Sequence, residues 1–137
     1  MVDIHAMLKL MADQGASDLF LTCGATPHIK IQGVTHSIKV PPFKPGDVKE
    51  LAHSLMTDRQ SAAFEDSLEA NLSLSLDGVG RYRINVFWQR GEVGMVIRLI
   101  KSAIPSFEQL HLPPQCAQLA MLKRGLVLFV GAAGSGK

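Results

Sequence analysis

The spacing of apolar residues along the first forty positions changes from helical to strand-like. Near the N-terminus, apolar residues recur three and four positions apart, which is the spacing of one helix face. They are Ile4, Met7, Leu8 and Met11. We expect this helix to end at about Gly15. Three strands are then predicted over residues 18–22, 29–31 and 34–40.

The next sixty residues repeat this change of pattern. A second amphipathic helix is expected around Val48–Leu55, and Asp58 is the predicted N-cap of a third helix that reaches about Leu68. Three more strands are predicted over residues 72–76, 81–89 and 92–100. This order of helices and strands predicts an α+β domain, with a mostly antiparallel sheet and helices packed on one face.

The last two of these strands are expected to form a hairpin with a turn centred on Arg90 and Gly91. In this register one face of the hairpin pairs apolar and aromatic residues throughout. The pairs are Trp88 with Val93, Val86 with Met95, Ile84 with Ile97, and Tyr82 with Leu99. A shift by one residue would scatter these side chains, so the register is well specified.

The pattern dissolves after Ile100, and residues 103–115 contain three prolines, which is typical of a connecting segment. A short helix is expected from Pro114 to Leu122. The apolar run Leu126–Val130 then has the length of a buried parallel strand, and a glycine-rich turn follows it directly.

That turn has the spacing Gly-x-x-x-x-Gly-Lys of a phosphate-binding loop. In such loops the backbone N–H groups surround phosphates and the lysine reaches the terminal ones, which indicates an ATPase. The residues predicted to bind nucleotide here are Gly131, Gly134, Ser135, Gly136 and Lys137. The alternative is a flexible glycine-rich tail.

The hairpin register also places Arg83 directly opposite Arg98 on the second face, with Arg81 one pleat away. Like charges directly across a strand pair are destabilising. Either these side chains turn into solvent or pair with acidic residues from elsewhere, or an anion lies between them. Arginine suits bidentate phosphate contacts, and the phosphate loop favours the anion.

Composition narrows the possible functions. The chain has 137 residues, 47% of them hydrophobic and 19% charged, which is typical of a globular protein. A net charge of +2 gives no reason to expect a nucleic-acid partner. No apolar stretch approaches the length of a membrane span, and we expect no signal peptide. The two cysteines and five histidines form no ligand motif, so no metal site is expected.

Several segments resemble type IV pilus retraction ATPases of the PilT/PilU type, in the secretion-ATPase superfamily. The similarity runs from the first helix to the last residue. The segments that carry it are Ser17–Thr22 with Gly24 and Pro27, Gly80–Phe87 with Arg98 on the next strand, and Lys123–Gly131 at the entry to the phosphate loop. Residues 104–107 and 129–132 are nearer to the PilU form.

The resemblance implies a PAS-like N-terminal domain over residues 1–101, a linker over 102–124, and the start of a RecA-like ATPase domain over 125–137, truncated at the Walker A lysine. It implies a hexameric motor that uses ATP and Mg²⁺ to power pilus retraction and twitching motility. The motor would be cytoplasmic and peripheral at the inner membrane. Its implied partners are the other subunits, a PilT-type motor and the inner-membrane pilus platform protein. The alternative is a PAS-like ligand-binding or protein-interaction module without enzymatic role.

The resemblance also implies that Arg83 and Arg98 hold nucleotide phosphates, with Arg81 beside them. The family's magnesium-binding Ser/Thr and its acidic catalytic residues have no counterpart in the chain, so no catalytic residue is predicted. We therefore expect the parent protein to be an ATP hydrolase, and this chain alone to be inactive and to hold no bound cofactor. We also expect residues 125–137 not to form a nucleotide-competent loop by themselves, and the two arginines to be exposed and weakly paired.

Overall fold

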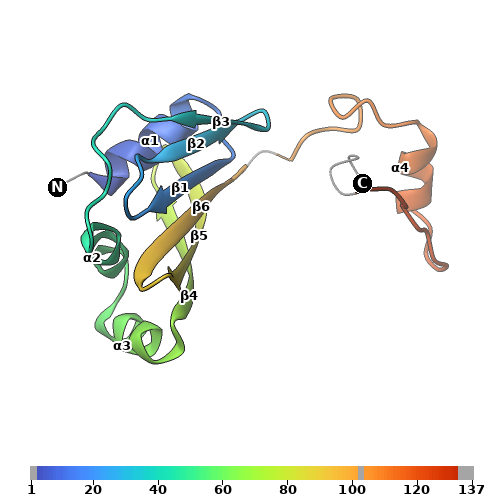
Figure 1. Ribbon diagram of the computed structural model, residues 1–137. Helices are drawn as coiled ribbons and strands as arrows, with labels where there is room; N and C mark the ends of the chain where they lie inside the picture. The colour runs from blue at the N-terminus through green and yellow to red at the C-terminus, as the bar shows by residue number, and fades with distance from the viewer. Residues whose placement is uncertain (1–2, 102–103, 133–137) are drawn as a thin grey trace. The chain divides into compact units, whose positions relative to one another are not determined.

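The computed structural model describes residues 3–101 and 104–132 (Figure 1). The chain divides into two compact units, residues 1–102 and 103–137. In chain order, the elements described in the first unit are α1 (Ile4–Asp13), β1 (Asp18–Thr22), β2 (His28–Ile31), β3 (Val34–Ser37), α2 (Asp47–Ser54), α3 (Asp58–Ser67), β4 (Glu69–Leu76), β5 (Gly80–Gln89) and β6 (Glu92–Ile100). The predicted order of helices and strands is confirmed.

The strands of the first unit form one six-stranded sheet in the order β3-β2-β1-β6-β5-β4. Each neighbouring pair in this sheet is antiparallel. Short hairpins join β2 to β3, β4 to β5, and β5 to β6, whereas β1 and β6 are brought together from opposite ends of the unit (Figure 1). The structure therefore confirms an α+β unit with an antiparallel sheet.

The predicted register of the β5–β6 hairpin is confirmed at every position that the sequence specified. Trp88 lies opposite Val93, and Arg83 lies opposite Arg98. The turn residues Arg90 and Gly91 have φ angles of 51° and 79°. Positive φ at both central residues is the signature of a two-residue hairpin turn whose twist matches that of the strands.

The hydrophobic core is one cluster to which the sheet and all three helices α1, α2 and α3 contribute buried residues. The apolar stripe of α1 is buried as predicted, and Leu8 and Met11 are completely inaccessible to solvent. Tyr82 of β5 is also fully buried, and its hydroxyl donates a hydrogen bond of 2.8 Å to the backbone carbonyl of Leu8. This bond connects the helix to the centre of the sheet and satisfies a buried polar group.

Two local features differ from the sequence prediction. The N-cap of α3 is Thr57 and not Asp58, because Thr57 and Gln60 form a capping box in which each side chain accepts a hydrogen bond from the other residue's backbone N–H. Strand β3 ends at Ser37, three residues before the predicted end. The next residue, Ile38, hydrogen-bonds through its N–H to the carbonyl of Pro27, outside the β2–β3 ladder.

In the second unit, helix α4 (Gln115–Ala120) lies within the predicted short helix. Residues Leu126–Val130 form no strand there, and the exposed fraction ranges from 42% at Val127 to 91% at Val130. The apolar run with the pattern of a buried parallel strand is therefore not a strand here. A parallel strand requires neighbouring strands to pair with. Across the described residues, no helix combines the length and apolar character needed to span a membrane.

We predict that Tyr82→Phe lowers the free energy of unfolding by about 1 kcal/mol, because it removes the hydrogen bond to Leu8 while keeping the ring. Urea unfolding of the wild type and the variant would measure this difference. Tyr82→Ala serves as the reference for loss of the whole side chain and should cost about 3–5 kcal/mol. Equal losses in the two variants would contradict the role assigned to the hydroxyl.

Candidate site on the open face of the sheet

The polar face of β4, β5 and β6 carries the predicted arginine site. On β5 and β6, the residues that alternate with the buried core set point to this face, and Arg81, Arg83 and Arg98 are all exposed there. A depression of about 370 Å³ lies between the strands. Its lining residues are Glu69, Asn71, Arg83, Asn85, Val96 and Arg98.

Arg98 is paired with a buried carboxylate, which the sequence did not predict. Strand β1 lies next to β6 in a register that sets Asp18 directly opposite Arg98. The Nε of Arg98 donates to Oδ1 of Asp18 at 2.8 Å. The side chain of Asp18 is 8% exposed and that of Arg98 is 69% exposed. The expectation that both arginines are weakly paired is therefore wrong for Arg98, although its exposure is as expected.

The Asp18 carboxylate is held from more than one side. The hydroxyl of Ser17 donates to its second oxygen at 2.8 Å, and Lys30 lies across from it on β2. Burial raises the pKa of the Asp18 carboxyl, but the hydrogen bonds from Arg98 and Ser17, together with the charges of Arg98 and Lys30, outweigh burial and lower this pKa below its ordinary value. Asp18 is therefore ionised at neutral pH.

Arg83 has a much weaker set of partners than Arg98. Its Nη2 lies 3.4 Å from Oδ1 of Asn71, at the long end for a hydrogen bond. The described residues place no carboxylate within ion-pairing distance of Arg83. The expectation of an exposed and weakly paired side chain holds here. In this site the charge of Arg98 is compensated by an ion pair with Asp18, whereas Arg83 beside it has no direct ion pair among the described residues.

The predicted phosphate-loop residues divide between described and undescribed positions. Gly131 belongs to the described part of the second unit. Gly134, Ser135, Gly136 and Lys137 lie outside the described residues. The assignment of these residues to nucleotide binding stays a prediction.

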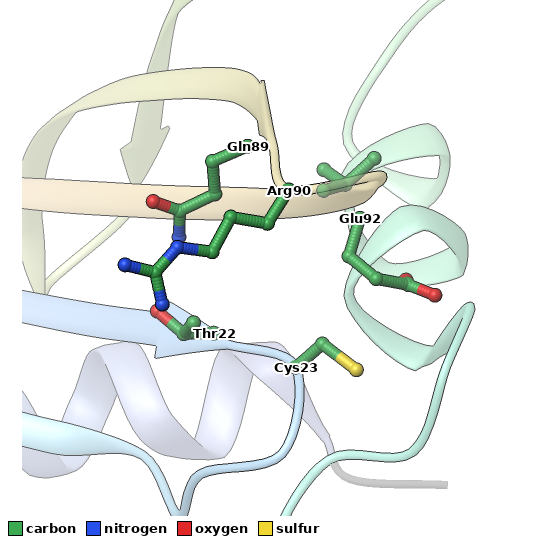
Figure 2. A pocket seen from close by; sticks show the side chains of 6 residues that line it. Thr22, Cys23, Gln89, Arg90 and Glu92 are labelled. Carbon is green, nitrogen blue, oxygen red and sulfur yellow. The ribbon is translucent and has the colours of Figure 1, made fainter.

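A second hollow lies at the end of the sheet, beside the β5–β6 turn. It has a volume of about 430 Å³. Figure 2 shows that the side chains lining it come from the end of β1, from the β5–β6 turn, and from the adjoining ends of β5 and β6. The side chain of Arg90 extends back past Gln89 toward Thr22 (Figure 2). Gln89 and Arg90 are both exposed. The hollow is therefore a surface feature, unlike the internal ligand pocket that a PAS-like sensor would use.

Cys23, which lines this hollow, has the properties of an unreactive thiol. Burial and the nearby carboxylates of Glu92 and Asp47 raise the pKa of the Cys23 thiol above its ordinary value. A thiol reacts as the thiolate, so this environment works against nucleophilic chemistry. Glu92 has a structural partner as well, because its Oε2 accepts a hydrogen bond of 3.2 Å from the N–H of Gly46 before α2.

Comparison with solved structures identifies a class of proteins that shares this fold. The chain superposes over its whole length on 40% of the crystal structure of the pilus retraction motor PilT with bound ADP, with a TM-score of 0.82 and 38% sequence identity. The Legionella pneumophila ATPase DotB matches with a TM-score of 0.63 at 20% identity, which shows a shared fold. No protein-family model matches the chain.

Comparison with curated sequences gives the particular relatives. The chain is 40% identical to the type IV pilus ATPase PilU and 38% identical to the retraction ATPase PilT, both of Pseudomonas aeruginosa, over 136 residues. It spans 36% and 40% of the lengths of these two proteins. Its homologues are thus PilU and PilT, and the chain corresponds to an N-terminal fragment of them.

We predict that Asp18 stabilises the fold in a pH-dependent way. Its pKa is lowered in the folded state, so its contribution is present above the unfolded-state pKa of about 3.9 and is lost as the pH falls through the native value. Asp18→Asn should lower the free energy of unfolding by about 1 kcal/mol at neutral pH, and this difference should shrink as the pH falls below the unfolded-state pKa of about 3.9 and through the lower native pKa.

Urea unfolding of both proteins across that pH range is the measurement. Asp77→Asn, in the exposed turn after β4, is the matched control for loss of one carboxylate. A wild-type advantage over Asp18→Asn that grows as the pH falls would contradict the assigned ionisation.

Proposed function

We propose that the chain is the N-terminal part of a hexameric motor ATPase that powers type IV pilus retraction and twitching motility. The observation that carries this proposal is the 38–40% identity to PilT and PilU over the whole chain. In this proposal residues 1–101 form a PAS-like domain, residues 102–124 form a linker, and residues 125–137 begin a RecA-like domain. The parent motor would be cytoplasmic and peripheral at the inner membrane, with a PilT-type motor and a pilus platform protein as partners.

Within that motor, we propose that the arginine face contacts nucleotide phosphates. Arg83 and Arg98 lie directly opposite each other on a solvent-exposed face, and Arg83 has no carboxylate partner among the described residues. Two adjacent guanidinium groups can offer several N–H donors in the planar geometry that suits phosphate oxygens. ATP and Mg²⁺ would be held mainly by the phosphate loop, and the arginines would add charge stabilisation during phosphoryl transfer.

The cleanest test is Arg83→Ala in a longer chain that includes the complete motor domain. Loss of an arginine that stabilises transferring phosphate should lower ATP turnover by up to about a thousandfold. Because Arg83 is exposed and weakly bonded, the free energy of unfolding should change by less than about 0.5 kcal/mol. Steady-state ATP hydrolysis and thermal unfolding would be measured on the same purified protein.

Arg59→Ala is the matched control, because Arg59 is an exposed arginine on α3, outside the candidate site. Its turnover should equal that of the wild type. Arg98→Ala is a less direct test, since it leaves the buried Asp18 carboxylate without its guanidinium. Wild-type turnover in Arg83→Ala would rule out a phosphate contact by Arg83.

We also propose that Leu126–Val130 becomes a paired strand when the rest of the motor domain is present. Backbone amides in this segment should exchange rapidly with solvent in the 137-residue chain, where the segment forms no strand. In the longer motor they should be protected by about a thousandfold or more. Hydrogen–deuterium exchange on both proteins would show this, and equal exchange in the two would refute the assignment of the segment to a sheet.

A further inference from the structure

We propose that Asp18 is a positioning residue that holds Arg98 in a preset orientation for an anionic phosphate group. This inference rests on the proposed function of the arginine face and adds a residue to it. Asp18 would not touch the nucleotide. It would act through the guanidinium of Arg98, by fixing one edge of that group and leaving the rest for the ligand.

The hydrogen bonds of Arg98 support this division of its donors. A guanidinium has five N–H donors. Among the described residues, the side chain of Arg98 uses its Nε, which donates to Oδ1 of Asp18 at 2.8 Å. The four N–H groups on its two terminal nitrogens make no hydrogen bond within the described chain. Because the arginine side chain is 69% exposed, these groups can reach a ligand from solvent.

Asp18 is well suited to act as a fixed support. It lies on β1, which has neighbours on both sides in the sheet, β2 and β6. The preceding residue, Ser17, is tied to both neighbours, since its N–H donates to the carbonyl of Lys30 at 2.8 Å and its carbonyl accepts from the N–H of Leu99 at 3.0 Å. The Ser17 hydroxyl then fixes the second oxygen of Asp18. A supporting group held this firmly reduces the orientations open to Arg98.

The ion pair also makes the juxtaposition of two arginines tolerable before a ligand arrives. Arg83 and Arg98 are direct cross-strand partners, and like charges in such positions repel. The carboxylate of Asp18 compensates the charge of Arg98 and leaves that of Arg83 for the anion. The two arginine side chains are therefore held differently before a ligand binds. Arg98 is oriented by Asp18, whereas Arg83 makes only a long contact to Asn71.

The experiment is a double-mutant cycle on ATP turnover in the longer motor, with Asp18→Asn, Arg98→Ala and the double variant. Asn keeps the shape of the side chain and removes its charge. If Asp18 acts through Arg98, Asp18→Asn alone should lower kcat/KM by about 10- to 100-fold, as expected for a displaced catalytic contact. In the Arg98→Ala background it should cause no further loss, and it should raise the Tm, because the unpaired buried carboxylate is gone.

The possible results separate the two proposals. Wild-type turnover in both Arg83→Ala and Arg98→Ala would overturn the phosphate contact itself. Reduced turnover in Arg98→Ala with wild-type turnover in Asp18→Asn would overturn the positioning role and leave the contact standing. A further loss on adding Asp18→Asn to Arg98→Ala would show that Asp18 acts elsewhere, and would also overturn it.

Two more variants keep the test decisive. If Asp18→Asn does not fold by circular dichroism, Ser17→Ala replaces it, because it removes only the hydroxyl that fixes the second carboxylate oxygen. It should lower kcat/KM by a few-fold in the wild-type background and have no effect in the Arg98→Ala background; an equal loss in both would refute the proposal. Asp77→Asn, with turnover equal to wild type, controls for removal of one negative charge.

Discussion

The pairing of β1 with β6 is the constraint on which the rest of the first unit depends. It joins the β1–β3 half of the sheet to the β4–β6 half, so that the six strands form one surface. On one side of that surface the register brings Leu19 next to Ile97, both without solvent exposure, and completes the core beneath α1. On the other side the same register brings Asp18 next to Arg98. One strand pairing thus fixes both the packing and the electrostatics.

The two faces of the sheet obey opposite physical requirements. The covered face gains stability by excluding water, and the buried hydroxyl of Tyr82 on this face is satisfied by a carbonyl of α1. The open face retains guanidinium, amide and carboxylate groups that remain hydrated or pair with one another. Its one deeply buried charge, within the described residues, is Asp18, which is stabilised by Arg98 and Ser17. Such a face can offer charge to a ligand without weakening the core.

Local patterns predicted much of this structure. Alternation along β5 and β6 was sufficient to set their register, because a slip of one residue would have turned Tyr82 and Ile84 to solvent. The β1–β6 pairing could not be derived in that way, since residues 23–91 separate the two strands in the chain and no short turn fixes their alignment. Asp18 was therefore visible as part of a family-like segment, but its partner was not. The N-cap of α3 was predicted one residue too late, at Asp58. The spacing of Thr57 and Gln60, which form the capping box, was a local signal for the correct residue.

The arginine face shows why charge patterns on a strand pair are informative when the register is known. A lone exposed arginine carries little meaning, but two arginines directly opposite each other require a compensating charge, a ligand or solvent separation. The structure contains the first of these for Arg98 and a long polar contact for Arg83. A buried acid that neutralises one member of the pair keeps both arginines on the same face while leaving net positive charge at Arg83, which is the condition that an anion-binding surface requires.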